Sequence, residues 1–352
     1  MNFLVCDLSA VANPELITAN DRLMSYEDVN GDANWNSSVH APISWHSYAA
    51  AMNGRIVSVP KDNWREQIAW ADTVLALWNY DPGIAMQIIQ DIKKQGKLVI
   101  GAFHENGDTL QMHARNVSWL IDFKNCANAC DAILTYPRHK IYQHFYRTLS
   151  ITTEFLEWPQ PYYTLKRKDY IIASELRQGI FIGPRKKNHE IERRNWIYNI
   201  AMAKDLIGKP FGLYPEIFNK ITTINDTDFS NESLKAELET LLDGCYVEVI
   251  KPLKYDDYLR TIATHQITIN MDASDTQGQV DADSMFVGVP LYQPSGFDFR
   301  TDFGDLYYSC IQSGQTPEQA TETIMTRMCT FENTRKLITN WYARANAKPI
   351  TL

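Results

Sequence analysis

The sequence predicts an α/β protein built from two successive blocks, each with a parallel sheet. Short apolar runs of strand length alternate with longer amphipathic stretches, and the alternation is interrupted once, by a proline- and lysine-containing segment over residues 159–170. Strands that alternate with helices form βαβ units, which give parallel sheets. A chain of 352 residues is also long for one domain, which favours two.

The first block begins with the apolar run Phe3-Leu-Val-Cys6, which predicts a buried strand. Residues 84–92 place apolar side chains at helical spacing, and a second helix is expected over about 140–149. We therefore expect residues 1–160 to form a Rossmann-like domain. Its further strands are predicted at 73–77, 97–101, 132–135 and 153–158.

The second block repeats this alternation after the linker. We expect residues 161–335 to form a second Rossmann-like domain and residues 336–352 a terminal helix that packs back on the first. A polar loop is expected after residue 293. Strands are predicted at 179–183, 246–250 and 267–270, and helices at about 190–206, 255–264, after Asp283, 317–330 and 332–346.

Composition narrows the class of protein. A hydrophobic fraction of 45% supports packed cores, and a net charge of −8 argues against adhesion to nucleic acid through overall charge, although a local basic groove stays open. Cys126 and Cys130 could share a helix face, but no second pair follows to complete a zinc site. We therefore expect the cysteines to be free thiols and no metal to be bound. Neither a signal peptide nor an apolar run of about 20 residues is present, which predicts a cytoplasmic protein.

The most informative segment runs from Asp275 to Pro290. Asp275 and Asp283 are eight residues apart, slightly more than two helical turns, so both carboxylates can face one side of a turn that leads into a helix. Gly278 lies between them, and a helix that begins there offers unpaired N–H groups to a phosphate or sugar oxygen. The alternative is a solvated acidic turn before an ordinary helix.

The segment resembles the Glu-x7-Glu motif of GT-B glycosyltransferases, especially the family-4-like retaining enzymes, with Asp in place of Glu at both positions. Gly288-Val-Pro290 resembles the end of that family's motif helix, and Cys130-Asp-Ala-Ile-Leu-Thr135 resembles its "ADAVITVS" strand. Phe181-Ile-Gly-Pro-Arg185 stands where the family has "VGRL". The matches occur in the family's order along nearly the whole chain.

The resemblance implies a GT-B fold, in which two Rossmann-like domains with parallel sheets face a central cleft, and a nucleotide-sugar donor, with UDP-sugar expected and no cofactor. The N-terminal domain would bind the acceptor and the C-terminal domain the donor. Asp283 would hold the ribose at the cleft, and Asp275 and Gly278 would contact the donor sugar, with Thr276 and Gln277 between them. The resemblance also implies transfer with retention of anomeric configuration.

The diphosphate of the donor requires positive charge, and Gly183-Pro-Arg185-Lys186-Lys187 follows a predicted strand. The family places a lysine about five residues after its arginine, but Glu190 stands there, so Lys186 or Lys187 would take that role or the role is absent. A solvated basic loop is the alternative.

In the first domain, His104, Glu105 and Asp108 follow the strand that ends near Ala102. The family often has a histidine in this region that contacts the donor sugar, whereas an inverting enzyme would need a base, for which Glu105, Asp108 and Asp81 are candidates. A structural histidine is the alternative for His104.

The acceptor stays open between a saccharide or glycolipid and a modified base in phage DNA, of the 5-hydroxymethylcytosine type. Base modification would require flipping the base out of the helix and cations along the DNA backbone. A GT-B nucleotide-sugar epimerase and a non-catalytic two-lobed binding protein are the competing functions. The candidate DNA-contacting cations are Arg138, Lys140, Lys166, Arg167 and Lys168.

Overall fold

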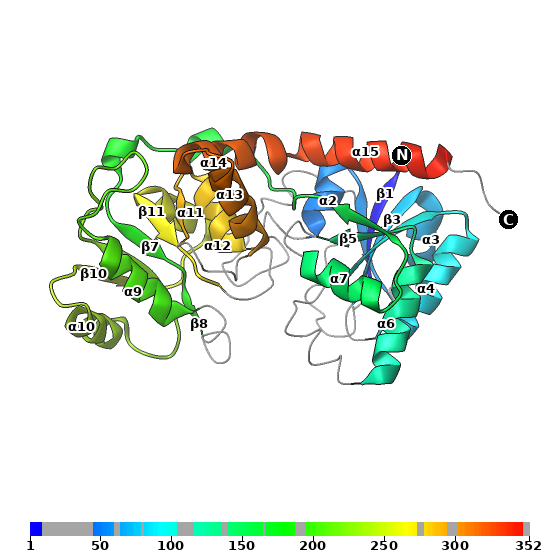
Figure 1. Ribbon diagram of the computed structural model, residues 1–352, viewed down its shortest axis with the longest axis horizontal. Helices are drawn as coiled ribbons and strands as arrows, with labels where there is room; N and C mark the ends of the chain where they lie inside the picture. The colour runs from blue at the N-terminus through cyan, green and yellow to red at the C-terminus, as the bar shows by residue number, and fades with distance from the viewer. Residues whose placement is uncertain are drawn as a thin grey trace. The chain divides into compact units, whose positions relative to one another are not determined.

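The described residues of the computed structural model fall into two compact units, each with its own sheet and helices (Figure 1). Unit 1 contains the described residues up to Tyr163 and those from Cys329 onward, and unit 2 contains those from Thr164 to Met328. The structure describes residues 1–8, 45–59, 64–78, 81–103, 116–135, 140–164, 166–186, 195–272, 278–293 and 301–347.

Unit 1 is built on a sheet whose pairings are all parallel, in the order β2-β1-β3-β4-β5-β6. The central strand β3 is buried at every residue, because helices cover both faces of the sheet. The strands are β1 (Phe3–Asp7), β2 (Arg55–Ser58), β3 (Thr73–Trp78), β4 (Leu98–Phe103), β5 (Ala132–Thr135) and β6 (Glu154–Glu157).

The alternation of side chains along β1 separates two cores. Leu4 and Cys6 face one core, and Phe3 and Val5 face the other. On the Leu4 side lie α3 (Trp64–Trp70), α4 (Pro82–Lys94), α6 (Val117–Ala129) and α7 (Lys140–Thr148), and on the Phe3 side lie α2 (His46–Ala51) and α15 (Phe331–Ala347).

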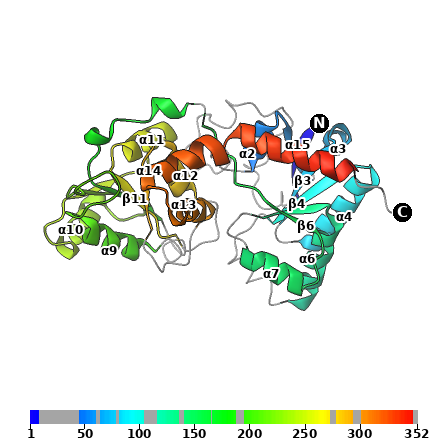
Figure 2. The ribbon, with the colours of Figure 1, turned by 45° about the horizontal axis from the view of Figure 1, so that its top comes forward.

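The last described helix, α15, packs against α2 in unit 1 (Figure 2). Its Ile338 and Trp341 are buried in the core, and Trp341 meets Trp158 edge to face at 6.4 Å between ring centroids. The Arg335 Nε donates to the carbonyl oxygen of Ala51 at 3.0 Å. The C-terminal helix is therefore an integral layer of unit 1.

Unit 2 has a second all-parallel sheet, in the order β10-β9-β7-β11-β12, with β8 paired to β9. The chain starts in the middle strand, builds outward to one side, and then returns to the other. The strands are β7 (Ile180–Ile182), β8 (Arg185–Lys186), β9 (Ile221–Asp226), β10 (Val247–Ile250), β11 (Ile267–Ile269) and β12 (Leu291–Tyr292).

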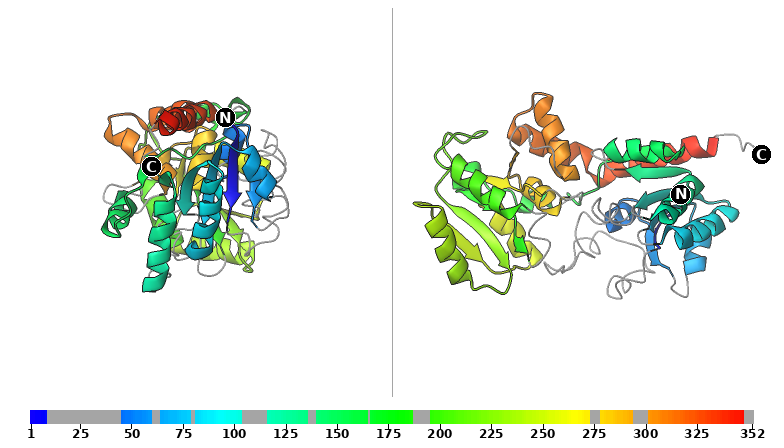
Figure 3. Two further views of the ribbon diagram at one scale, coloured as in Figure 1. Left: turned by 90° about the vertical axis from the view of Figure 1, so that its right-hand side faces the viewer. Right: turned by 60° about the horizontal axis from the view of Figure 1, so that its bottom comes forward.

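Helices also cover both faces of this sheet (Figure 3). Ile180 and Ile182 face the core that α9 (Trp196–Leu206) and α10 (Asn231–Leu241) close. Phe181 faces the opposite side and meets Tyr258 of α11. The remaining elements are α11 (Tyr255–Ala263), α12 (Gln279–Phe286), α13 (Asp302–Gln312), α14 (Pro317–Thr323), the π-helical turn η6 (Ile324–Met328), and the 3₁₀ turns η4 (Arg167–Asp169) and η5 (Ser174–Leu176).

The predicted α/β class with two parallel Rossmann-like sheets is confirmed. Among the described residues, no helix combines the length and the apolar character needed to span a membrane. One missed helix, α13, begins at Asp302 where a polar loop was expected. The other elements that the sequence-based prediction missed are β2, β8, β9, α2, α3, α6 and α10. The helix predicted over 317–330 divides into α14 and η6.

Candidate functional site

The order of the strands in unit 2 indicates where a ligand binds. The sheet is built in opposite directions from β7, so β7 and its neighbour β11 flank the point where the strand order reverses. Ligands of open parallel sheets bind beyond the carboxyl ends of the strands at such a point. The residues that follow β7 and β11 here are Gly183 and Asn270.

Gly183 provides a close approach between these two strand ends. A Cβ at this position would lie 3.0 Å from the Asn270 Oδ1. The backbone N–H of Gly183 donates to the carbonyl oxygen of Ile269 at 3.2 Å. The predicted donor-binding residue Gly183 therefore lies at the reversal point of the sheet.

Gly278 begins α12 in a left-handed conformation, with a φ of +85°. A Cβ there would lie 2.1 Å from the Thr301 Oγ1, so only glycine fits without displacing Thr301. The N-cap residue itself, a glycine, has no side chain that could cap the helix. The first turn of α12 therefore combines a compact backbone with the positive end of a helix dipole.

Asp281, in the first turn of α12, is a buried carboxylate that the sequence-based prediction did not identify. Its Oδ1 accepts a hydrogen bond from the Asn270 Nδ2 at 3.0 Å, and its Oδ2 accepts one from the Thr301 hydroxyl. The sequence signal was its spacing of two residues from Asp283 within a helix whose side chains, apart from Gln279, are otherwise small or apolar.

Asp283 lies on the same helix and its side chain is buried, so its role toward the ribose stays a prediction. Its Oδ1 accepts a hydrogen bond from the Tyr255 hydroxyl at 2.6 Å. Tyr255 is the first residue of α11, so this bond joins the start of α11 to the middle of α12. The carboxylate is held in a fixed orientation.

Arg185 lies in β8, opposite Asn225 of β9. Its guanidinium carbon is 5.2 Å from the ring centroid of Trp196 and 4.9 Å from that of Phe229. Two aromatic rings therefore hold the cation at the carboxyl edge of the sheet, where cation–π contact leaves the edges of the guanidinium available for hydrogen bonds.

Phe229, which contacts Arg185, also lines a polar pocket. It lies at the ends of β9 and β10 and at the start of α10. Its lining residues are Asn225, Asp226, Thr227, Phe229, Ser230, Asn231, Glu232, Lys251 and Pro252.

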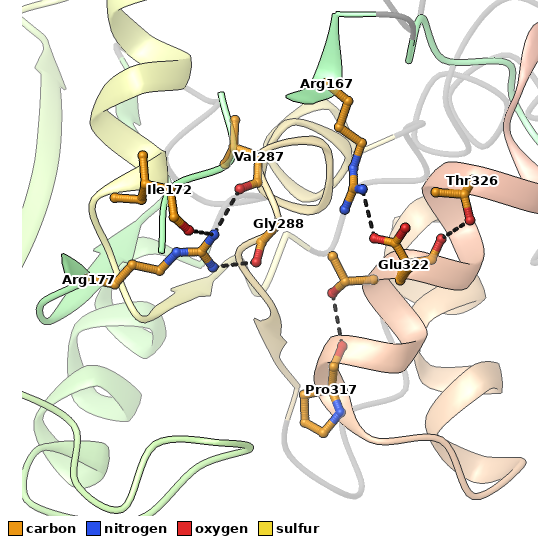
Figure 4. A network of polar contacts seen from close by, with 9 residues as sticks. Arg167, Ile172, Arg177, Val287, Gly288, Pro317, Glu322 and Thr326 are labelled. Atoms are coloured by element: carbon orange, nitrogen blue, oxygen red, sulfur yellow. Dashed lines mark hydrogen bonds and ion pairs between the residues drawn. The ribbon is translucent and has the colours of Figure 1, made fainter. Parts of the chain in front are cut away.

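The carboxyl end of α12 is fixed as firmly as its start (Figure 4). The buried guanidinium of Arg177 donates to the carbonyl oxygens of Gly288, of Val287 at 3.1 Å and of Ile172 at 3.3 Å. Gly288, with a φ of +77°, terminates the helix in the left-handed conformation. The Gly288-Val-Pro290 sequence, which resembles the family motif, thus follows α12 at the point where the Arg177 guanidinium donates to the last carbonyl oxygens.

Several predicted site residues lie outside the described residues, so their roles stay predictions. Lys186 belongs to β8, but only its backbone is described. The undescribed residues are His104, Glu105 and Asp108 after β4, Asp275, Thr276 and Gln277 before Gly278, and Lys187 after β8.

Asp81, a base candidate, caps a helix. Its Oδ1 accepts a hydrogen bond from the backbone N–H of Ile84 at 2.9 Å, which accounts for an aspartate before Pro82 at the start of α4. In the described part of the chain, no group of three histidine, cysteine, aspartate or glutamate side chains could hold a metal ion.

Arg167, one of the cations expected along a DNA backbone, is buried and does not form part of an exposed basic surface. Its Nη1 lies 2.7 Å from the Glu322 Oε2, and Glu322 in turn precedes the π-helical turn (Figure 4). The interpretation of Arg167 as a DNA contact is therefore wrong: the residue joins η4 to α14.

Comparisons with known proteins give matches among solved structures. No protein-family profile and no curated protein matches the sequence. The chain is similar to sucrose-phosphate synthase from Thermosynechococcus elongatus at 11% identity and a TM-score of 0.51, covering 99% of this chain and 100% of that one. It is similar to α,α-trehalose 6-phosphate synthase from Burkholderia multivorans at 6% identity and a TM-score of 0.51, covering 98% and 97%.

The pneumococcal O-GlcNAc transferase GtfA, solved with UDP and GlcNAc, matches at 12% identity and a TM-score of 0.46, over 78% of this chain. This chain covers 57% of the length of GtfA. The matched structures are GT-B glycosyltransferases, and the full-length matches confirm the predicted GT-B architecture. At these identities the likeness extends to the fold, and the activity has to be argued from the site.

Proposed function

We propose that this protein is a glycosyltransferase that binds a nucleotide-sugar at the carboxyl edge of the unit 2 sheet and transfers the sugar to an acceptor hydroxyl. The observation that carries the proposal is the start of α12. Gly278 opens the helix with a φ of +85°, and Asp283 follows within the same helix, held by Tyr255 at 2.6 Å. The start of α12 is joined to the end of β11 by the Asn270–Asp281 hydrogen bond, and β11 flanks the strand-reversal point, where parallel α/β sheets bind nucleotides.

The chemistry needs a group that stabilises the departing diphosphate. The bond between the anomeric carbon and the diphosphate oxygen breaks, a bond to the acceptor oxygen forms, and the acceptor hydroxyl proton is released with the nucleoside diphosphate. Arg185 supplies a permanent positive charge, and the backbone at Gly183 and Gly278 allows close approach. Asp283 would hold the ribose hydroxyls, and Asp275 the sugar.

Retention of configuration is part of the proposal, because the Asp275-x7-Asp283 spacing with Gly278 resembles the motif of retaining enzymes. A retaining transfer of this kind needs no general base from the protein. Glu105→Gln and Asp108→Asn should then each keep measurable transfer, whereas removal of a true base costs about 10²–10⁴-fold. NMR of the anomeric proton of the product decides the stereochemistry, and an inverted product would refute retention.

For the acceptor, we propose a saccharide or a sugar phosphate. Two full-length fold neighbours are named as synthases of sugar phosphates. The net charge of −8 and the burial of Arg167 both weaken the case for a polyanionic DNA acceptor. Parallel assays with sugar phosphates, glycolipids and hydroxymethylated DNA separate these classes, and transfer to DNA alone would overturn the saccharide assignment.

The direct test is donor binding and turnover. A thermal-shift screen against UDP-, GDP-, ADP- and dTDP-sugars should show one strong stabiliser, since a ligand at 100 times its Kd adds about 2.7 kcal/mol. Release of the nucleoside diphosphate should then depend on the acceptor, and EDTA should leave the rate unchanged, because the proposed charge stabilisation comes from Arg185. Epimerised donor sugar without transfer would indicate the epimerase instead. Absence of binding by every nucleotide-sugar would refute the proposal.

A further inference from the structure

Four chain segments meet at the buried carboxylate of Asp281. The end of β11 contributes the Asn270 amide, 3.0 Å from the Oδ1, and the start of α13 contributes the Thr301 hydroxyl, which donates to the Oδ2. α12 carries Asp281 itself in its first turn. Gln293, which follows β12, contributes the fourth segment, because its side-chain amide lies beside Gly304 of α13, next to the same carboxylate.

The packing at this junction leaves no room for adjustment. A Cβ at Gly304 would lie 2.4 Å from the Gln293 Nε2, 3.1 Å from the Thr301 Oγ1 and 3.4 Å from the Asp281 Oδ2. A Cβ at Gly278 would meet the Thr301 Oγ1 at 2.1 Å. Two glycines therefore let the ends of β11, β12, α12 and α13 converge on one carboxylate.

A carboxylate suits this position because it only accepts hydrogen bonds. Both of its oxygens face donors, and these donors belong to different segments, so one side chain sets the spacing between them. Its charge also lies in the first turn of α12, where the helix dipole favours an anion. The Thr301 hydroxyl also accepts the Gly304 N–H at 3.0 Å and so caps α13.

We propose that Asp281 is the positioning residue of the donor site. This inference rests on the proposed function. Asp281 holds Asn270 and Gly278 in place, and these two residues flank the sequence that contains Asp275. The carboxylate acts through its neighbours, Asn270 and Thr301, and does not itself contact the donor.

Asp281→Asn replaces one accepting oxygen by an NH₂ group. If the amide NH₂ faces Asn270, a donor meets a donor. If it faces Thr301, the hydroxyl can accept that N–H only by turning its own O–H away, and the O–H loses its carboxylate acceptor. We expect the donor KM and the Kd of UDP to rise about tenfold or more, with a smaller change in kcat, since hydrogen bonds to charged groups are among the stronger ones.

Thr301→Val removes the same hydrogen bond from the other side and should raise the donor KM similarly, while Thr301→Ser, which keeps the hydroxyl, should restore it. If Asp281→Asn does not fold, the Thr301 pair still tests the proposal. A double-mutant cycle between Asp281 and Thr301 should show strong coupling in donor affinity, because the two side chains act through one contact.

Two variants control for lost stability alone. Thr316→Val removes the cap of α14, where the hydroxyl accepts the Gln319 N–H at 3.3 Å, so it matches the capping defect of Thr301→Val. Ser284→Ala removes a buried hydroxyl of α12 that lies 2.9 Å from the Thr268 Oγ1. Both should lower Tm and leave the donor KM unchanged.

Nucleotide-sugar binding by the wild type tests the proposed function, and the donor KM of the Asp281 and Thr301 variants tests this inference separately. If the wild-type protein binds no nucleotide-sugar, the glycosyltransferase proposal fails and this inference fails with it. If the wild type turns over and the Asp281 and Thr301 variants lower Tm as the controls do but keep the wild-type donor KM, Asp281 is only a structural residue and the inference is overturned.

Discussion

Asp283 and Tyr255 form the best-defined polar pair of the candidate site at the scale of single residues. The tyrosine hydroxyl donates to a carboxylate that is fully buried, so the charge keeps a fixed orientation. A fixed carboxylate loses little freedom when it accepts hydrogen bonds from a ribose, which is the advantage of preorganisation. Under the proposed function, Tyr255 would support Asp283 without touching the donor.

Asp283→Asn should weaken binding of the donor nucleotide by about 1.5–3 kcal/mol, the value of a hydrogen bond to a charged group. Tyr255→Phe keeps the ring and removes only the hydroxyl, so it should weaken binding less than Asp283→Asn does. Isothermal titration with UDP measures both. Wild-type affinity in the Asp283 variant would show that this carboxylate serves the fold alone.

Arg185 is the second residue whose chemistry can be tested directly. Since charge on the leaving diphosphate grows in the transition state, Arg185→Ala should lower kcat by about 10²–10³-fold while the acceptor KM changes little. Arg185→Lys should recover only part of the rate, because an ammonium lacks the planar fork that stacks on Trp196 and Phe229.

Arg344→Ala is the matched control for Arg185. Arg344 is an exposed arginine on α15 whose Nη2 lies 3.3 Å from the Glu154 Oε1 in unit 1, and its loss should leave kcat unchanged. Equal rates for the Arg185 and Arg344 variants would mean that the Arg185 guanidinium only packs against the two rings.

At the scale of elements, α12 is fixed at both ends by different means. Its start depends on the left-handed Gly278 against Thr301, and its end depends on Arg177 and the left-handed Gly288. The helix itself is short and buried along most of its length, so its position cannot come from an amphipathic surface pattern. The position of Asp283 is therefore set by these two junctions.

Gly278→Ala and Gly314→Ala separate backbone strain from crowding. Both glycines have positive φ, +85° and +92°, and an alanine in this conformation costs about 1–2 kcal/mol. A Cβ at Gly314 meets nothing within 4 Å, whereas one at Gly278 lies 2.1 Å from Thr301. Denaturant unfolding should show a clearly larger loss for Gly278→Ala, accompanied by weaker donor binding. Equal losses and an intact donor Kd would contradict the close packing at this turn.

At the scale of the whole molecule, the parts that could be predicted from sequence are those with apolar strand runs. The strands β1, β3 and β7 were predicted because their residues are apolar on both faces, as buried parallel strands require. β9, Ile221–Asp226, was missed because two threonines and a polar end hide a strand that is buried in its first five residues. Asp281 was missed for a related reason, since its partners Asn270 and Thr301 are distant in sequence and burial of a carboxylate is visible only in three dimensions.

The two units have separate hydrophobic cores, so each should contribute its own unfolding transition. The buried side chain of His265 should make the unfolding transition of unit 2 sensitive to acid. His265 is buried before β11, and its Nδ1 lies 2.8 Å from the carbonyl oxygen of Thr261. Burial lowers its pKa from 6.5 to about 4, with a further lowering by Lys220, while hydrogen bonds to the Thr261 and Ile262 carbonyls and the charge of Glu248 act in the opposite direction.

Because the folded pKa is lower than the unfolded one, the unfolded state binds the proton first. The stability that the neutral imidazole contributes is present above pH 6.5 and is lost as the pH falls from 6.5 toward 4. Between pH 8 and pH 5 the free energy of unfolding of unit 2 should fall by about 2 kcal/mol through this group. Calorimetry at the two pH values should show the unit 2 transition move to lower temperature, and His265→Gln should remove most of that movement whatever its own Tm. A variant that keeps the full pH dependence would assign the acid sensitivity to other groups.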